Sequence, residues 1–369
     1  MAVSLCKEIS RKPPLKAFMN IHGLSQKPAA LSRSGVITAA ALVSAATTAL
    51  WVEMQARRAE RDHPPTGEIM DIDGVQLHYA DRGEGPPVVL IHGNTVTHAD
   101  FLASGLMDRL ARNHRVIAFD RPGFGHSSRP RDRLWTPSAQ ADLLRAALQR
   151  LGVERPVVVG HSMGTMVAVA MALSYPENVH SLVLVGGYFF PSFRVDAFLT
   201  APVALPVLGD VMRYTVTAVS GRLMLKKMAQ SMFAPRELPD NFFPVISREM
   251  MLRPVQLRAN AEDAAFMVPA ANTMSKRYGE LILPVTIVAG EDDLVVDPQA
   301  HSARLHHELP HSELHLMSQT GHMAHYAALD IVANAIDRPL QAVAMQSFTS
   351  MTKDDLTLKT APESELGRR

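Results

Sequence analysis

From residue 67 onward, short apolar runs alternate with longer segments in which apolar residues recur every three or four positions. The short runs are rich in Val, Ile and Leu, which is typical of buried strands, and they cover 87–93, 156–160, 181–187, 284–290 and 313–319. The longer spacing predicts helices over 138–152, 163–172 and 299–308, and another that begins near His322. Strands that alternate with helices predict a doubly wound, mostly parallel α/β sheet covered on both faces.

Two segments depart from this alternation. Residues 67–86 predict a hairpin that turns at Asp73-Gly74. Between the strand that ends at Gly187 and the strand near Pro284 lie about 95 residues, too many for a plain loop. Their helical apolar spacing predicts a cap over 188–280. The core is then expected in two parts, 67–187 and 281–340, followed by a flexible tail over 345–369.

The N-terminal region has a different pattern. A polar, basic stretch predicts a disordered tail over 1–34, and residues 35–52 contain no charge. As a helix, these 18 residues would extend about 27 Å, close to the thickness of a bilayer core. We expect a single membrane anchor; a cleaved export signal and a helix packed on the surface are the alternatives. Lys and Arg flank both sides evenly, so the orientation is not predicted.

Composition excludes several classes of function. The chain has 369 residues, a net charge of +1 and no basic stripe, which argues against nucleic acid as a partner. Its single cysteine, Cys6, provides neither a disulfide framework nor a thiol nucleophile in the core. The sixteen histidines lack the spacing of a metal site; those at 301, 306, 307 and 311 are expected on a solvated face. No metal and no cofactor are therefore expected.

The strongest local motif is GHSMG at 160–164. It lies between a predicted strand and a predicted helix, so Ser162 would occupy the sharp turn between them. Small residues at Gly160 and Gly164 would let the strand and helix backbones approach closely. The turn would raise the hydroxyl above the sheet beside the first N–H groups of the helix, a position that suits a nucleophile.

A serine nucleophile needs a base and an orienting carboxylate. Both types occur downstream, each directly after a predicted strand: acidic residues in AGEDDLVVDP and a histidine in SQTGHMAHY. The carboxyl ends of parallel strands meet at one edge of the sheet, so these groups are expected near Ser162. The order along the chain is Ser, Asp, His.

These landmarks resemble the α/β-hydrolase family over roughly 67–340. LIHGN, FDRPGFGHS, GHSMG, GEDD followed by Asp297-Pro298, and TGH occur in the order of that family. The resemblance implies Ser162 as the nucleophile, Asp293 as the acid and His322 as the base. Asp292 and Asp297 are alternatives for the acid, and His325 for the base; the remaining histidines are expected at the surface.

The resemblance also implies an oxyanion hole made by the backbone N–H groups of Asn94 and Met163. The HGN sequence around Asn94 is similar to hydrolases that expel halide or open epoxides. Those relatives use an aspartate where this chain has Ser162, so that chemistry is disfavoured. Thr165 stands where a second glycine often follows the motif, and it is expected to alter the fit of helix and oxyanion loop.

The expected function is therefore hydrolysis of apolar or lipid-like carboxylic esters through an acyl-enzyme, because the cap sequence offers few polar clusters to line a pocket. A carbon–carbon bond hydrolase acting on vinylogous diketones, and a cofactor-free perhydrolase, use the same triad and remain alternatives. A ligand-binding module without turnover is the alternative of another class. Phe189, Met228 and Phe266 are the expected cap positions in the pocket. The oligomeric state is not predicted.

Overall fold

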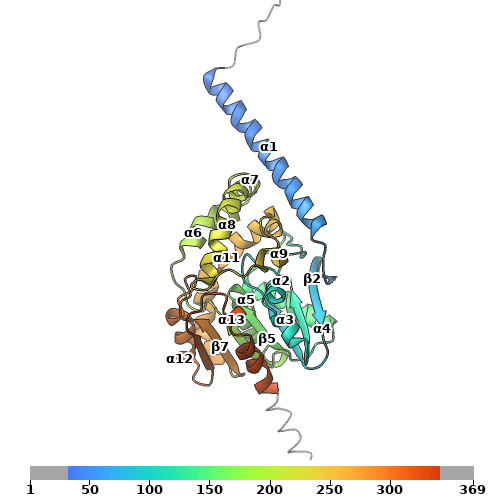
Figure 1. Ribbon diagram of the computed structural model, residues 1–369, viewed down its shortest axis with the longest axis vertical. Helices are drawn as coiled ribbons and strands as arrows, with labels where there is room; N and C mark the ends of the chain where they lie inside the picture. The colour runs from blue at the N-terminus through green and yellow to red at the C-terminus, as the bar shows by residue number, and fades with distance from the viewer. Residues whose placement is uncertain (1–31, 341–369) are drawn as a thin grey trace, which may run out of the picture. The chain divides into compact units, whose positions relative to one another are not determined.

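The computed structural model describes residues 32–340 and is shown in Figure 1. The predicted tail at 345–369 and most of the predicted tail at 1–34 lie outside the described residues. Contacts within the chain divide it into two units, 1–44 and 45–369. The second unit contains the sheet, its covering helices and the cap.

Helix α1 (Arg33–Asp62) contains the predicted membrane segment and continues ten residues beyond it. It is the one helix among residues 32–340 that is long and apolar enough to cross a membrane. Its length and composition suit a membrane anchor and a signal sequence equally. Residues 45–62 of this helix belong to the second unit, where Val52 and Ala59 are buried.

The described residues form one eight-stranded sheet in the order β1-β2-β4-β3-β5-β6-β7-β8. The strands are β1 (Glu68–Ile72), β2 (Val75–Arg82), β3 (Pro87–Ile91), β4 (Arg115–Phe119), β5 (Val157–His161), β6 (Ser181–Val185), β7 (Val285–Gly290) and β8 (Glu313–Met317). β1 and β2 form the predicted hairpin, and the two turn residues both have positive φ, which Asp-Gly tolerates. β2 is antiparallel to β4, and all pairs from β4 to β8 are parallel.

Helices cover both faces of the sheet. The helices of the core are α2 (Ala99–Ala103), α3 (Leu106–Leu110), α4 (Pro137–Arg150), α5 (Met163–Ser174), α12 (Arg304–Glu308), α13 (Ala324–Ala327) and a last helix over 329–340; short turns lie at η1 (Pro176–Asn178) and η3 (Gln299–Ala303). Val89 and Ile91 of β3 face α4 and α5, whereas Val88 and Leu90 face α2, α3 and the last helix. The predicted doubly wound sheet is thus confirmed, and its parallel strands are apolar on both faces because both are buried.

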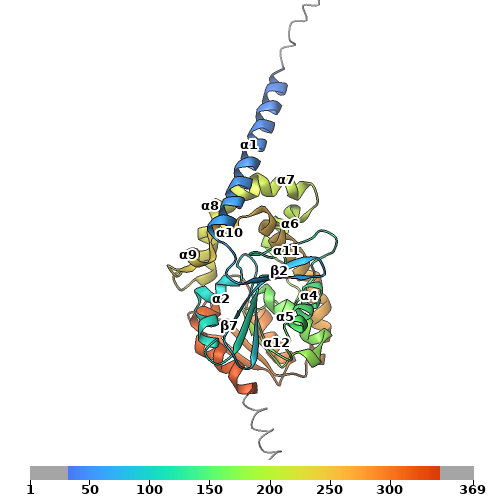
Figure 2. The same cartoon turned by 90° about the vertical axis from the view of Figure 1, so that its right-hand side faces the viewer.

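The insertion after β6 folds as helices above the carboxyl ends of the strands (Figures 1 and 2). These are α6 (Val195–Ala204), α7 (Leu208–Tyr214), α8 (Val216–Phe233), α9 (Phe242–Ile246), α10 (Arg248–Met251) and α11 (Pro254–Met274), followed by the turn η2 (Ser275–Glu280). α11 packs against α6, α7 and α8, and also against α5 of the core. The cap is thus joined to the core through α11 and also through α9, which packs against α2.

Candidate active site

Ser162 occupies the turn between β5 and α5. Its backbone has φ 51° and ψ −119°, a conformation that a residue with a Cβ rarely adopts. Two bonds hold it: the Ser162 N–H donates to the Val185 carbonyl at 2.8 Å, and the Thr165 hydroxyl donates to the Ser162 carbonyl at 2.6 Å. Thr165, expected to alter the fit of the helix, is fully buried and fastens the turn instead.

The glycines around the serine allow the close packing that the turn needs. A Cβ at Gly164 would lie 2.1 Å from the Ile91 carbonyl oxygen, and one at Gly160 would lie 2.6 Å from the Gly164 carbonyl oxygen. Both distances are shorter than any real Cβ contact. Strand β3, strand β5 and helix α5 can therefore meet at this point only where the two residues lack side chains.

Asp293 and His322 form a buried pair on the loops after β7 and β8. The His322 Nδ1 and the Asp293 Oδ2 are 2.8 Å apart. The Asp293 Oδ1 accepts the N–H groups of Val295 at 2.7 Å and Val296 at 2.9 Å. Burial would raise the pKa of the Asp293 carboxyl, but the imidazole and these N–H groups hold that pKa below its usual value. An ionised carboxylate fixed in this way suits a group that orients an imidazole.

The alternative acids and base have different surroundings from Asp293 and His322. Asp292 is exposed, and Asp297 accepts the N–H groups of Gln299 and Ala300 at the start of a helical turn. The His325 Nε2 lies 3.0 Å from Asp100 in the core. Of the predicted site residues, the structure brings Ser162, Asp293 and His322 to the wall of one cavity, together with Asn94, Met163 and the alternative acid Asp297.

The loop that carries Asn94 is fixed by Arg121, the second residue after β4. This buried guanidinium donates to the carbonyls of His92 and Gly93 at 2.9 and 3.1 Å and to the Asn94 Oδ1 at 2.7 Å. The bond to Oδ1 fixes the orientation of the Asn94 side-chain amide and leaves its NH₂ group as the remaining donor. The HGN sequence thus has a structural partner that lies 27 residues further along the chain.

The cap helix α11 holds the same loop from the other side. The Thr95 N–H donates to the Asn260 Oδ1 at 2.7 Å, and the Gln256 Nε2 donates to the Thr95 carbonyl at 2.8 Å. Asp263, one turn further along α11, is paired with both Arg121 and Arg129. All three of these charged side chains are fully buried. Buried charges on α11 and in the segment after β4 therefore join the cap to the loop that carries Asn94.

The cavity has a volume of about 800 Å³ and a wall of mixed character. Apolar side chains include Met228, Met232 and Met267 from the cap. Polar side chains include Ser192, Arg194 and His301. The wall therefore combines apolar side chains with polar and charged ones, which contradicts the expectation that polar clusters would be scarce there.

Comparison with known proteins identifies the family. The family model described as alpha/beta hydrolase fold matches residues 86–328. The chain belongs to the α/β-hydrolase family.

Among curated relatives of this α/β-hydrolase, a 2-hydroxymuconate semialdehyde hydrolase from Pseudomonas putida is 29% identical over 272 residues, which are 72% of this chain and 90% of the relative. A 2-hydroxy-6-oxononadienedioate/2-hydroxy-6-oxononatrienedioate hydrolase from the same species is 31% identical over 68% of this chain and 87% of the relative. Their names match the alternative expectation of carbon–carbon bond cleavage better than the main expectation of ester cleavage. Both relatives support the statement that the chain is a hydrolase.

Solved structures agree on the fold. An esterase from Thermogutta terrifontis superposes with a TM-score of 0.59 at 23% identity, covering 74% of this chain and 97% of the esterase. A meta-cleavage product hydrolase from Pseudomonas fluorescens superposes with a TM-score of 0.55 at 22% identity, covering 75% and 98%. At these identities the likeness shows the α/β-hydrolase fold alone.

Several pocket residues of this α/β-hydrolase were not foreseen. His301, expected on a solvated face, is buried: its Nδ1 accepts the N–H groups of Phe189 and Phe190 at 3.1 and 3.2 Å. Burial, aided by the charge of Arg194, lowers the pKa of His301 to about 4, so the ring is neutral. Met228 lines the cavity as expected, whereas Phe189 lies in the core and Phe266 lines a separate hollow.

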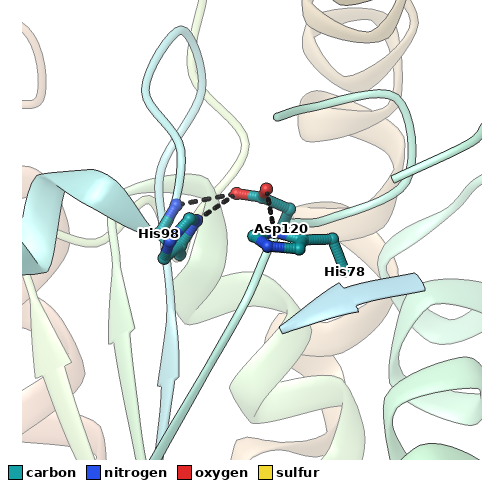
Figure 3. Close-up of side chains that lie close together, drawn as sticks. All are labelled: His78, His98 and Asp120. Atoms are coloured by element: carbon teal, nitrogen blue, oxygen red, sulfur yellow. Dashed lines mark hydrogen bonds and ion pairs between the residues drawn. The ribbon is translucent and has the colours of Figure 1, made fainter. Parts of the chain in front are cut away.

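The expectation that the other histidines are surface residues was wrong, because several are buried in carboxylate clusters. In Figure 3, His78 and His98 both point at Asp120, with Nδ1 atoms 2.7 and 2.9 Å from its two oxygens. The Gly67 N–H donates to the His78 Nε2, so the His78 Nδ1 carries the proton. Both imidazoles hold the pKa of Asp120 well below its usual value, despite its burial.

Two buried clusters, His78–His98–Asp120 and Asp100–His161–His325, each bring three possible metal-ligand atoms within 4.8 Å of one another. In the first cluster the two imidazoles bond directly to Asp120, at distances shorter than the about 3.3 Å that separates ligands around a tetrahedral zinc ion. In the second cluster, Asp100 lies 3.0 Å from His325 and 3.8 Å from His161, and it also accepts the Tyr326 hydroxyl at 2.8 Å. These buried contacts support the loop that carries His322 on the side that faces the core.

Proposed function

We propose that this α/β-hydrolase is a serine hydrolase that uses Ser162, His322 and Asp293 as nucleophile, base and orienting acid. The observation that carries the proposal is the 2.8 Å Asp293–His322 pair in the wall of the cavity that also contains the strained turn of Ser162. The N–H groups of Asn94 and Met163 would receive the oxyanion, each contributing about 3 kcal/mol to the transition state.

For the substrate we propose a conjugated ketone that carries a carboxylate, cleaved at the carbon–carbon bond beside the ketone. Two curated relatives, aligned with 72% and 68% of this chain, act, by their names, on 2-hydroxymuconate semialdehyde and on 2-hydroxy-6-oxononadienedioate or 2-hydroxy-6-oxononatrienedioate. The cavity of this chain suits such a molecule: Arg194 can attract the carboxylate, and the methionines can contact an apolar acyl part.

The reaction would proceed in two halves. Ser162 Oγ attacks the ketone carbon, and its proton passes to the His322 Nε2. Collapse of the oxyanion breaks the carbon–carbon bond, and the electron pair enters the conjugated chain, which takes the proton from His322. Water then attacks the acyl-serine ester; His322 accepts a proton from that water and returns it to Ser162 Oγ. Overall, the diketone and one water molecule are converted into a carboxylic acid and an enol.

An apolar ester is the second candidate, because Met228, Met232 and Met267 give the cavity room for an acyl chain without demanding a charge. The same nucleophile and base would serve, with an alkoxide in place of the carbon leaving group. The two candidates differ in one respect that the structure makes testable. A carboxylated diketone needs the cation of Arg194, and a neutral ester does not.

The test compares three substrates with the same acyl group: a carboxylated vinylogous diketone, its methyl ester at the carboxylate, and a p-nitrophenyl ester. We expect the carboxylated diketone to have the highest kcat/KM, and Arg194→Gln to raise its KM about tenfold or more through loss of a charge-assisted bond. The matched control, Arg338→Gln, removes an exposed guanidinium far from the cavity and is expected to change nothing. Faster turnover of the nitrophenyl ester, unaffected by Arg194→Gln, would establish the ester function.

We further propose that α1 anchors the protein in a membrane. The part of α1 beyond the apolar stretch is built into the body: Val52 and Ala59 are buried, and Glu60 is paired with Arg253 at 2.7 Å. The apolar stretch itself is exposed over most of its length, as expected of a segment that faces lipid. The full chain should therefore resist alkaline carbonate extraction from membranes. A chain recovered without residues before about 46 would indicate a cleaved signal.

A further inference from the structure

The outer surface of the cap exposes large apolar side chains from three consecutive helices. We call this surface the cap apolar face and define it by Phe198, Leu199, Val207, Val211, Val216 and Leu223. Their exposed fractions range from 58% for Val211 to 80% for Leu223. α6, α7 and α8, which carry them, lie together at the cap end of the molecule (Figure 1). On a soluble protein, a group of exposed apolar side chains of this size marks a site of interaction.

The spacing of these residues shows that they form a second face of the cap helices. In α8, Ala218, Leu225 and Ala229 are buried against the rest of the cap. Val216, Val219 and Leu223 recur at three and four positions on the opposite side of the same helix. In α6, Phe198 and Leu199 are exposed although the helix packs against α11. The cap is therefore apolar on its inside and on its outside.

The contacts of α1 indicate what covers this outer face. The uncharged stretch of α1 ends at Val52, and the neighbouring Trp51 ring lies 4.7 Å from the Arg222 guanidinium of α8. Tryptophan is enriched where a membrane segment leaves the bilayer. The cap apolar face thus begins beside the point where the membrane segment of α1 would end, and Lys226 and Lys227 of α8 are exposed next to it.

We infer that the cap apolar face lies in the interfacial layer of the lipid bilayer that holds α1. Phe198, Leu199 and Leu223 enter the boundary between headgroups and acyl chains. Lys226 and Lys227 face anionic headgroups. This inference rests on the proposed membrane anchor and goes beyond it, because it concerns where the substrate comes from, for a diketone or an ester alike.

Two of the helices that carry the cap apolar face also line the cavity. Phe193, Val195 and Met228 line the cavity, and all three are also exposed, Phe193 at 82%. Val195 begins α6 and Met228 belongs to α8, so the cavity wall continues onto the helices that carry the cap apolar face. An amphiphile dissolved in the bilayer can therefore reach Ser162 along apolar side chains without first entering water.

The test places a fluorophore at the face and quenches it from the lipid. The full chain carries Cys6→Ser, which removes its only cysteine, and one new cysteine at either Phe198→Cys or Leu223→Cys. The protein is reconstituted in vesicles of phosphatidylcholine and phosphatidylglycerol with a fraction of doxyl-labelled lipid. Ile282→Cys is the matched control: Ile282 is 85% exposed and apolar, but it precedes β7 at the amino end of the strand.

We expect the two cap labels to be quenched about threefold or more over the control, as for side chains that lie 5–10 Å deep in the interface. Equal quenching at Ile282, or none at the cap while the protein sediments with the vesicles, overturns the inference. A full chain that stays in solution overturns it as well. Cap labels that are unquenched and cross-link to each other identify the face as an interface between two copies, which also overturns it.

A second measurement uses activity. Phe198→Asp combined with Leu223→Asp is expected to slow hydrolysis of a substrate embedded in vesicles about tenfold while leaving a short, water-soluble substrate unchanged, because neither residue lines the cavity. Ile282→Asp is expected to change neither rate. Equal loss on both substrates overturns the inference. Quenching does not depend on turnover, so a failure of the proposed function leaves its result intact.

Discussion

Replacing Asp293 by asparagine tests the orientation of His322 more sharply than removing the side chain. Oδ1 of this residue accepts two backbone N–H groups, from Val295 and Val296, so the asparagine oxygen must take that position. Its NH₂ group then faces the His322 Nδ1, which is 2.8 Å from Oδ2 in the native protein. An NH₂ donor forces the proton onto the His322 Nε2, and that atom can then no longer accept a proton from Ser162.

The wrong tautomer is expected to lower kcat about 10⁴-fold, which corresponds to about 5.5 kcal/mol in the barrier, with KM almost unchanged. The free energy of unfolding should fall by only about 1.5–3 kcal/mol, the contribution of hydrogen bonds to a charged group. Single-turnover kinetics with thermal unfolding as the control separates the two effects. Asp297→Asn should retain near-native kcat, since Asp297 caps a helical turn. If Asp293→Asn kept a tenth of the native kcat, or Asp297→Asn lost more, the assignment of the acid would be wrong.

Three further predictions follow from the same geometry. Ser162→Ala should abolish both hydrolysis and labelling by a fluorophosphonate probe with little change in unfolding temperature; labelling that persists would refute the nucleophile. Asp263→Ala should cost about 3–5 kcal/mol of stability in denaturant titrations because two buried guanidinium groups lose their partner. Glu280→Ala, which breaks an exposed pair, should leave the unfolding midpoint nearly unchanged. Burial lowers the pKa of His301 to about 4, so between pH 6.5 and 4 the unfolded chain binds more protons than the folded one, and the free energy of unfolding falls as the pH falls. His301→Gln should reduce this loss by on the order of 2–3 kcal/mol. An unchanged dependence of the unfolding free energy on pH would contradict the prediction.

The sequence alone predicted those parts of the site that are formed by residues close together along the chain. The strand before Ser162, the glycines on either side and the helix after it lie within twenty residues, so their pattern could be interpreted without knowing the rest of the fold. The same holds for the Asp-Gly turn of the first hairpin. Asp293 and His322 each follow a strand directly, and the strand ends of a parallel sheet meet at one edge.

The pocket wall could not be predicted in this way, because its residues are selected by contacts between distant segments. His301 looked like a member of a polar, histidine-rich helix, and only the approach of the chain at Phe189 and Phe190, about 110 residues earlier, buries it. Arg121 belongs to a recognisable motif, but its partner Asp263 lies 142 residues away in the cap. Sequence spacing carries no information about such pairs, so the charged network and the polar part of the cavity stayed unforeseen.

The attachment of the Asn94 loop to α11 has a consequence for engineering. Cap segments of related hydrolases are attractive units to exchange between enzymes when a new substrate range is wanted. In this protein the exchange would have to stop short of α11, since Gln256, Asn260 and Asp263 hold the loop that would receive the oxyanion. Grafts over α6–α8 would alter substrate entry alone, whereas grafts that include α11 would also remove part of the catalytic machinery. A graft that changes the substrate range and keeps the reaction should therefore end inside the cap, between α8 and α11.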